Sequence, residues 1–368
     1  MNRDLQKAIW VSTVGIVIFG LMAVYSASYS NARVSHEIFY DQLICAVLGF
    51  VMMYGLGKMD YRRFYDMAYP FYIFNILLLL AVLLSSRYIL GARRWIEMGG
   101  INFQPSEFMK LSVILMLGRY FANRPPRLSF SFFTKAQIIL RDLIFPFILV
   151  GIPIVLIFKQ PDLGTAIMIF GIFLGMLFVS ELELKYFMGF LFACLSLVPL
   201  GWHILKDYQK DRLLVFLNPN IDPLGAGYTI IQSKIAIGSG QILGKGWLSG
   251  TQNQLNFLPE RHTDFIFSVI GEEWGLLGAL ILIGLYGVLI FCGLTIANQI
   301  RDRFGTFVTI GIVMILALQV IINIGMAMGL FPIVGLTLPL ISYGRSSLLT
   351  FLVMIGFLLN LSQRRTVF

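Results

Sequence analysis

The feature that most constrains this chain is a run of about 20 apolar residues, the length that crosses a bilayer as an α-helix, repeated from one end to the other. With 58% hydrophobic and 13% charged residues, the chain is too apolar to cover a soluble domain in polar groups. We place ten runs, at residues 9–27, 39–57, 67–85, 107–122, 143–159, 163–180, 186–205, 275–297, 304–329 and 344–361. The sequence therefore predicts an all-α polytopic membrane protein of about ten transmembrane helices, forming a single membrane domain over residues 1–368.

The formal net charge of +9 is explained by where the cations lie along this topology. Loops on one side carry Arg3, Lys7, Lys58, Arg62, Arg63, Arg119, Arg124, Arg127, Lys135, Arg141, Lys185, Arg301, Arg303, Arg364 and Arg365. The positive-inside rule assigns that side, with both termini, to the cytoplasm. The charge therefore indicates topology, and we expect no nucleic-acid partner.

The sequence does not indicate a disulfide, zinc or ATP site. Cys45, Cys194 and Cys292 lie in apolar runs, where packing is the expected role. The chain has no HxxxH, CxxC or GxxxxGK[ST] motif, so zinc and ATP sites are not predicted.

Two loops on the outer side are more than connectors. Residues 85–107 mix arginines with Trp95 and other apolar residues, which predicts a short amphipathic segment in the membrane interface. The large loop at 206–263 contains YTIIQSKIAIGSG, which predicts a short helix that dips toward the bilayer and ends at 238–240.

Acidic and basic residues interrupt an apolar stretch at LPERHTDFIFSVIGEEWG, residues 258–275. A helix from Asp264 to Ala297 would run about 51 Å at 1.5 Å per residue, against a hydrocarbon core of about 30 Å. We therefore predict a break at Gly271, next to Glu272 and Glu273. That break would place Asp264 at the outer mouth of the helix bundle.

Ionisable residues also lie at two other span ends. Glu107 and Lys110 are three residues apart at the start of the fourth run, so they share a helix face and can pair. Asp162, in QPDLGT, is open to two interpretations: a helix N-cap, or a functional carboxylate at membrane depth.

Together these residues predict a cavity on the outer side, lined by Arg93, Arg94, Glu107, Lys110, Lys234, Lys245, Arg261 and Asp264. Its cations suit an anionic ligand that arrives through lipid, such as a polyprenyl pyrophosphate. A lone carboxylate there would act as a general base, or would hold a divalent metal, magnesium or manganese, against the leaving group. Two functions would explain these charges: an enzyme that transfers a sugar from a lipid carrier, or a transporter whose path is lined by scattered charges.

A set of motifs resembles one family over nearly the whole chain, in order. These are QPSE at 104–107, QPDLGT at 160–165, DPLGAGY at 222–228, IIQSKIAIGSG at 230–240, GKGW at 244–247, FLPERHTDFIF at 257–267 and PLISYG at 339–344. They resemble the SEDS family (shape, elongation, division and sporulation proteins), and the 230–267 region is more similar to its rod-shape branch than to its division branch.

The resemblance implies a ten-helix peptidoglycan glycosyltransferase on the outer face of the bacterial cytoplasmic membrane. It would polymerise lipid II during elongation and release undecaprenyl pyrophosphate, with a class B penicillin-binding protein and the elongation machinery as partners. The family's essential aspartate matches Asp264, and its paired acid and lysine match Glu107 and Lys110. We expect Arg94, Lys234, Lys245 and Arg261 to bind substrate with that pair. The alternatives are a lipid II flippase and a scaffold that only recruits its partner.

One position departs from the family, which usually has a second glycine where this chain has Arg345, after Ser342, Tyr343 and Gly344. Either the backbone there does not need a positive φ, or the outer rim is rearranged.

Overall fold

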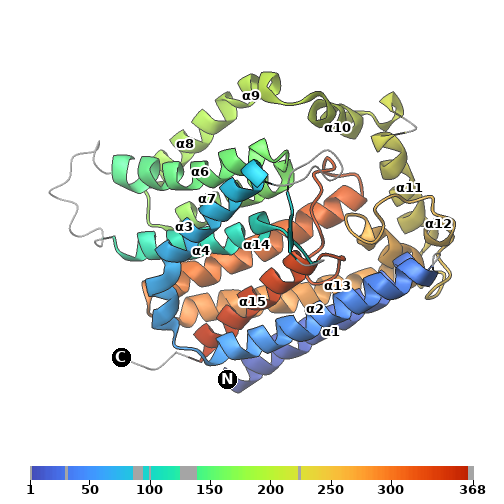
Figure 1. The fold of residues 1–368 in the computed structure, drawn as a ribbon, viewed down its shortest axis with the longest axis horizontal. Coiled ribbons are helices and arrows are strands. Elements are labelled where there is room, and N and C mark those ends of the chain that lie inside the picture. Colours follow the sequence, from blue (N-terminus) through green and yellow to red (C-terminus); the bar gives the residue numbers. More distant parts are fainter. Residues whose placement is uncertain are drawn as a thin grey trace. The chain divides into compact units, whose positions relative to one another are not determined.

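The protein's structure, a computed structural model, describes residues 2–29, 32–85, 94–98, 101–124, 139–222 and 225–363. These ranges are almost entirely helical (Figure 1). The long helices are α1 (Asn2–Ser28), α2 (Ala32–Lys58), α3 (Tyr61–Ser85), α4 (Pro105–Ala122), α6 (Phe145–Lys159), α7 (Leu163–Val179), α8 (Leu184–Ser196), α13 (Ile266–Gln299), α14 (Arg303–Ala327) and α15 (Arg345–Ser362). Shorter elements are η2 (Leu140–Ile144), α9 (Val198–Ile204), α10 (Asp207–Leu217), η3 (Pro219–Ile221), α11 (Ala226–Ser239) and α12 (Thr251–Gln254).

Each of the ten apolar runs is helical: the run at 143–159 falls on η2 and α6, the run at 186–205 on α8 and α9, and each of the others on one helix. Within the described ranges, eight helical segments are long and apolar enough to cross a membrane: α1, α2, α3, η2 with α6, α8 with α9, α13, α14 and α15. The other two runs are α4, which carries Glu107 and Lys110, and α7, which has 17 residues. Helices suit these runs because a spanning segment must satisfy its own backbone hydrogen bonds. The prediction of an all-α, multi-pass membrane protein is confirmed.

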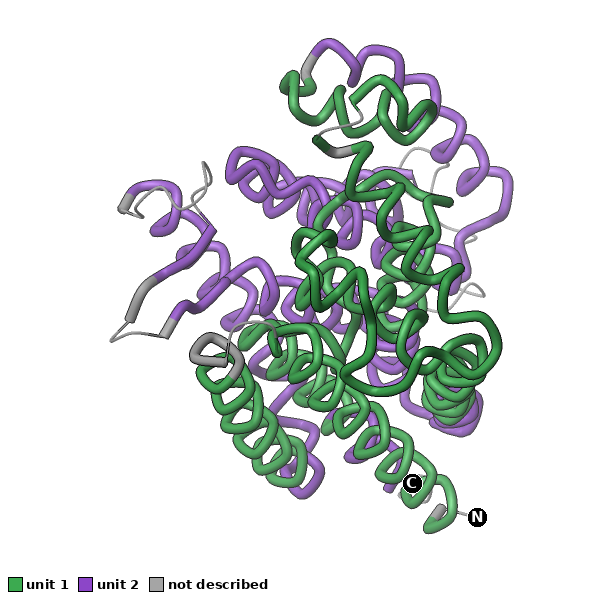
Figure 2. The backbone as a smooth tube through the Cα atoms, turned by 90° about the vertical axis from the view of Figure 1, so that its right-hand side faces the viewer, with its two compact units in different colours: residues 1–56, 205–292, 316–356 green, residues 57–204, 293–315, 357–368 purple. Residues whose placement is uncertain are grey.

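The chain forms two compact units (Figure 2). Unit 1 contains residues 1–56, 205–292 and 316–356, and unit 2 contains residues 57–204, 293–315 and 357–368. Helices α13, α14 and α15 contribute residues to both. The expected single membrane domain stays a prediction.

In unit 1, small residues allow long helices to approach closely, as is common between membrane helices. A Cβ added at Gly15 of α1 would lie 3.4 Å from Leu285 of α13. A Cβ at Gly356 of α15 would lie 2.9 Å from the carbonyl oxygen of Met53 in α2. These contacts pack α1 on α13 and α2 on α15.

In unit 2, α4 packs against α3, α6 and α7, and α6 also packs against α3 and α7. A Cβ at Gly118 of α4 would lie 3.0 Å from Val308 of α14. Helix α8, by contrast, has no buried residue, although its Phe190 packs edge-on against Phe147 of α6 and Phe173 of α7.

The two outer loops differ in outcome. The loop at 206–263 contains the predicted short helix as α11, with Gly240 at its C-cap. The segment at 85–107 contains a hairpin, in which β1 (Ile96–Met98) pairs antiparallel with β2 (Ile101–Phe103). The depth of either loop in a membrane stays a prediction.

Candidate functional site

The break in the long helix lies at Gly275, not at Gly271 as the sequence predicted. Gly275 has φ 62° and ψ −157° within α13, a conformation that residues with a Cβ rarely adopt. Four hydrogen bonds from the preceding loop replace the helix bonds that this break removes. The amides of Leu276 and Leu277 donate to the carbonyls of Gln241 and Ile242, at 2.9 and 3.0 Å. The carbonyls of Glu272 and Glu273 accept from the amides of Lys245 and Gly246, both at 3.0 Å.

Glu272, fully buried in the first part of α13, holds this loop in place. Its Oε1 accepts from the Lys245 ammonium at 2.7 Å, the Thr251 hydroxyl at 3.1 Å and the backbone amide of Gln252 at 3.0 Å. Its Oε2 accepts from the backbone amide of Asn253 at 3.3 Å, so the carboxylate also caps the start of α12. Lys245 therefore balances a buried carboxylate, and its expected role in substrate binding stays a prediction.

Asp264 lies two residues before α13 and is half-buried. The Asn323 side-chain amide of α14 donates to the Asp264 carbonyl at 2.9 Å and to the Leu336 carbonyl at 2.6 Å. The Ser342 hydroxyl donates to the Thr263 carbonyl at 2.6 Å. A Cβ at Gly335 would lie 3.7 Å from Asp264 Oδ2. The backbone that presents the carboxylate is thus fixed from the 335–342 segment and from α14.

The three residues before Asp264, at 261–263, are half-buried as well. Arg261 Nε donates to the Ala27 carbonyl at 2.5 Å, at the C-terminal end of α1, where a cation is favourable. Burial lowers the pKa of Arg261, but an arginine keeps its charge in proteins. Burial also lowers the pKa of His262, which favours the neutral imidazole at neutral pH. The His262 carbonyl accepts from the Tyr343 amide at 2.8 Å.

Lys234 lies on α11, and its side chain is exposed. The neighbouring Ser233 hydroxyl is 2.6 Å from the Ser268 hydroxyl, one turn after Asp264, and donates to the Ala327 carbonyl at 2.5 Å. These bonds attach α11 to the first turn of α13 and to the end of α14. Lys234 forms no ion pair with any other residue that the structure describes.

The predicted pair of Glu107 and Lys110 is present in unit 2. The Lys110 ammonium is 2.8 Å from both Glu107 Oε1 and Oε2. The side chain of Lys110 is fully buried and that of Glu107 is 8% exposed. A carboxylate in the first turn of α4 is also favoured by the helix dipole.

The N-cap interpretation of Asp162 is confirmed. Its side chain accepts from the Thr165 amide at 3.2 Å and from the Thr165 hydroxyl at 2.9 Å, at the start of α7. Gln104 donates to Asp162 Oδ2 at 3.3 Å, which joins the QPSE and QPDLGT motifs. Arg94 donates to the carbonyls of Gln160 and Pro161, at the end of α6.

The predicted cavity residues divide between the two units. Arg94, Glu107 and Lys110 belong to unit 2. Lys234, Lys245, Arg261 and Asp264 belong to unit 1. Arg93 lies outside the described residues. One cavity that all of them line stays a prediction, as do their roles in substrate binding.

Sequence reasoning missed Asn323 and the anchoring role of Glu272. Both are polar side chains in apolar runs, and such side chains usually have a specific hydrogen-bonding partner. A polar residue in an apolar run can therefore be recognised from the sequence. Its partner cannot, because the partner lies far away along the chain.

The departure from the family pattern is accommodated locally. Arg345 is absent from the residues with a positive φ, so its backbone does not need glycine. Its guanidinium forms an ion pair with Asp41 of α2, and the Tyr343 hydroxyl donates to the same carboxylate at 3.4 Å. The first of the two explanations is confirmed.

In the described part of the chain, no group of three or more His, Cys, Asp or Glu side chains is placed to hold a metal ion. Asp264 could therefore bind a divalent cation only with ligands from another source. Mg²⁺ is commonly held by one or two carboxylates together with substrate phosphates. The residues fit a metal of that kind and not an all-protein metal site.

Comparison with known proteins gives a matching family, a similar relative and two similar solved structures. The family model FTSW_RODA_SPOVE, described as "Cell cycle protein", matches residues 6–367. Peptidoglycan glycosyltransferase MrdB of Escherichia coli K12 is 39% identical over 356 residues, covering 96% of this chain and 92% of the relative.

Two solved structures are also similar. One belongs to a peptidoglycan synthase complex that coordinates polymerisation and crosslinking. Its TM-score is 0.79 at 32% identity, with 97% of both chains covered. The other is the rod shape determining protein RodA of Thermus thermophilus, with a TM-score of 0.70 at 30% identity, covering 97% of this chain and 96% of that one.

Proposed function

The chain belongs to the FTSW_RODA_SPOVE family of cell cycle proteins, and from that premise we propose how its residues carry out glycosyl transfer. It is a membrane-embedded peptidoglycan glycosyltransferase that polymerises lipid II into β-1,4 glycan strands during cell elongation. The names of relatives that match nearly its whole length support this activity.

The reaction inverts the configuration at the donor sugar, because an α-linked pyrophosphate is replaced by a β-1,4 bond. The acceptor 4-hydroxyl attacks the anomeric carbon, the bond to the pyrophosphate breaks, and the hydroxyl loses its proton. A general base is therefore needed at the acceptor. Undecaprenyl pyrophosphate leaves with the bonding electron pair.

Asp264 is the proposed base, or the metal ligand that organises the reaction. The observation that carries this assignment is its placement: a half-buried carboxylate on a backbone fixed by Asn323, with the neighbouring Thr263 fixed by Ser342. A catalytic group works best when its support is rigid. A Mg²⁺ or Mn²⁺ ion, if bound by Asp264 and substrate phosphates, would offset charge on the leaving group.

The cations are proposed to bind the lipid-linked pyrophosphate. Lys234 is the best candidate, because its ammonium is exposed on a helix attached beside Asp264. Arg261, Lys245 and Arg94 carry charge too, although each also has a structural contact. Substrate binding by the Glu107–Lys110 pair of α4 is part of the same proposal.

We further propose that the enzyme lies in the bacterial cytoplasmic membrane with both termini inside, and that a class B penicillin-binding protein is its partner within the elongation machinery. The distribution of cations supports the orientation. A similar solved structure couples polymerisation with crosslinking, which supports a crosslinking partner.

The test is polymer formation from labelled lipid II by the purified protein with its partner in detergent. Detergent removes any contribution from flipping, so polymer formed there argues against a chain that only transports or recruits. Asp264→Asn should abolish polymer while partner binding and melting temperature stay unchanged. The control is Asp207→Asn in the same large loop, whose side chain is fully exposed. Near wild-type polymerisation by Asp264→Asn would reject Asp264 as base or metal ligand.

A further inference from the structure

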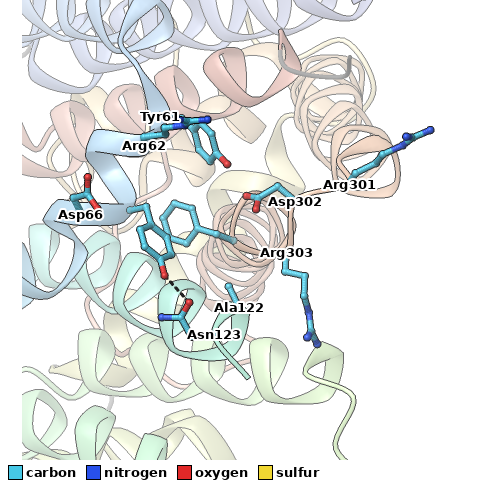
Figure 3. Close-up of a pocket in the computed structure, with 10 residues that line it drawn as sticks. Tyr61, Arg62, Asp66, Ala122, Asn123, Arg301, Asp302 and Arg303 are labelled. Carbon is cyan, nitrogen blue, oxygen red and sulfur yellow. Dashed lines mark hydrogen bonds between the residues drawn. The ribbon is translucent and has the colours of Figure 1, made fainter. Parts of the chain in front are cut away.

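A pocket in unit 2 is separate from every residue assigned above to glycosyl transfer. It has a volume of about 570 Å³ and is lined by Tyr61, Arg62, Tyr65, Asp66, Ala122, Asn123, Arg301, Asp302, Arg303 and Phe304. These residues come from the start of α3, the end of α4, the connection between α13 and α14, and the first two residues of α14 (Figure 3). The volume is in the range of small-molecule sites. The positive-inside rule places this end of the helices in the cytoplasm.

The pocket combines aromatic rings with two exposed carboxylates, Asp66 and Asp302. Phe304 packs edge-on against Tyr65, with ring centroids 5.2 Å apart, and its centroid is 6.4 Å from that of Tyr61. The Asp302 carboxylate and the Tyr61 side chain turn toward each other across the pocket (Figure 3). Aromatic rings beside a carboxylate favour an ammonium group.

The Asp302 carboxylate has an oxygen that can accept a hydrogen bond from an ammonium group. Its Oδ2 accepts from the Gly305 amide at 2.7 Å, which caps the start of α14. Its Oδ1 has no hydrogen-bond partner among the residues that the structure describes. One oxygen therefore holds the helix and the other is available to a donor.

The rim of the pocket is basic. Arg62 and Arg301 are exposed, and the Arg301 side chain points away from Asp302 (Figure 3). Arg301 forms no ion pair within the described ranges. Arg303 is already engaged, because it pairs with Glu181 at 3.2 Å and donates to the Arg124 carbonyl at 3.0 Å. Exposed guanidinium groups favour a phosphate.

An exposed apolar stripe on α3 leads away from the pocket. Asp66, a lining residue, is followed at helical spacing by Pro70, Ile73, Leu77, Leu80 and Leu84, which share its face. Ile73, Leu77 and Leu84 are 57%, 58% and 84% exposed. This stripe would contact an acyl chain whose headgroup occupied the pocket.

We propose that this pocket binds the headgroup of a zwitterionic phospholipid that carries a primary ammonium, namely a phosphoethanolamine lipid. The ammonium donates to Asp302 Oδ1 between the aromatic rings, and the phosphodiester accepts from Arg62 and Arg301. The acyl chains lie along the exposed stripe of α3. Basic pockets between membrane helices on the cytoplasmic side are known lipid sites, and the carboxylate selects the zwitterionic headgroup here.

The test is native mass spectrometry of the purified full chain in detergent, titrated with phosphatidylethanolamine or phosphatidylglycerol. The wild type should bind phosphatidylethanolamine about tenfold more tightly, the effect of one charge-assisted hydrogen bond. Asp302→Asn should remove that preference without unfolding, because asparagine is an equally good helix cap. Arg62→Gln should weaken binding of both lipids, whereas Arg63→Gln, its neighbour outside the pocket, should weaken neither.

Three results would overturn the proposal. The first is equal or tighter binding of phosphatidylglycerol by the wild type, and the second is an unchanged preference in Asp302→Asn. The third is binding of soluble phosphoethanolamine as tight as that of the lipid, which would make the site one for a free metabolite. The measurement does not depend on polymer formation, so it stands or falls independently of the glycosyltransferase assignment.

Discussion

Removal of the carboxylate of Glu107 should destabilise the protein severely. The pair it forms with Lys110 is enclosed: the lysine side chain is fully buried, and both carboxylate oxygens lie 2.8 Å from the ammonium. Glu107→Gln keeps the volume of the side chain but leaves a buried ammonium without its counter-charge. Breaking a buried pair in this way costs about 3–5 kcal/mol.

The assay is a double-mutant cycle measured by reversible unfolding in mixed detergent micelles. Glu107→Gln and Lys110→Met should each lower the free energy of unfolding by several kcal/mol, on the order of the value above. The double variant should lose much less than the sum of the two, because it buries no isolated charge.

A control pair lies in the same unit. Arg303 and Glu181 are 3.2 Å apart, and their side chains are 34% and 52% exposed. Glu181→Gln should change the free energy of unfolding by less than about 1 kcal/mol. Additive losses in the double variant, or an effect of Glu107→Gln no larger than that of Glu181→Gln, would refute the argument that the pair is desolvated.

Three further outcomes are expected. Lys234→Ala should raise the lipid II concentration needed for half-maximal rate by about tenfold, and Lys234→Arg should recover part of the loss. Identical titration curves would remove Lys234 from the site. Gly275→Ala should lower the free energy of unfolding by at least about 1–2 kcal/mol, because φ is 62° and the added Cβ would meet the backbone of Gly244. Wild-type stability would mean that the kink does not need glycine. Arg345→Gly should lower the free energy of unfolding by less than about 1 kcal/mol, since its ion pair with Asp41 is partly exposed. A larger loss of stability would show that the pair organises the outer rim.

The helices and the Glu107–Lys110 pair were predictable because their causes are local. A spanning segment must satisfy its own backbone groups, so about 20 apolar residues suffice to predict a helix. Within a helix, a spacing of three residues places two side chains on one face wherever the helix packs. The N-cap role of Asp162 follows in the same way, from its place at the start of an apolar run.

The sequence by itself therefore determined the ten helices, the pair on α4 and, through the family's motifs, the importance of Asp264. Only the tertiary structure decided where α13 breaks and how the residues around Asp264 are held. The break falls at Gly275 because residues 241–246 supply the four hydrogen bonds that the helix loses there. Asn323 fixes the carbonyl of Asp264 from 59 positions along the chain. Helical periodicity carries no information about such partners, because loop and helix meet only after the chain has folded.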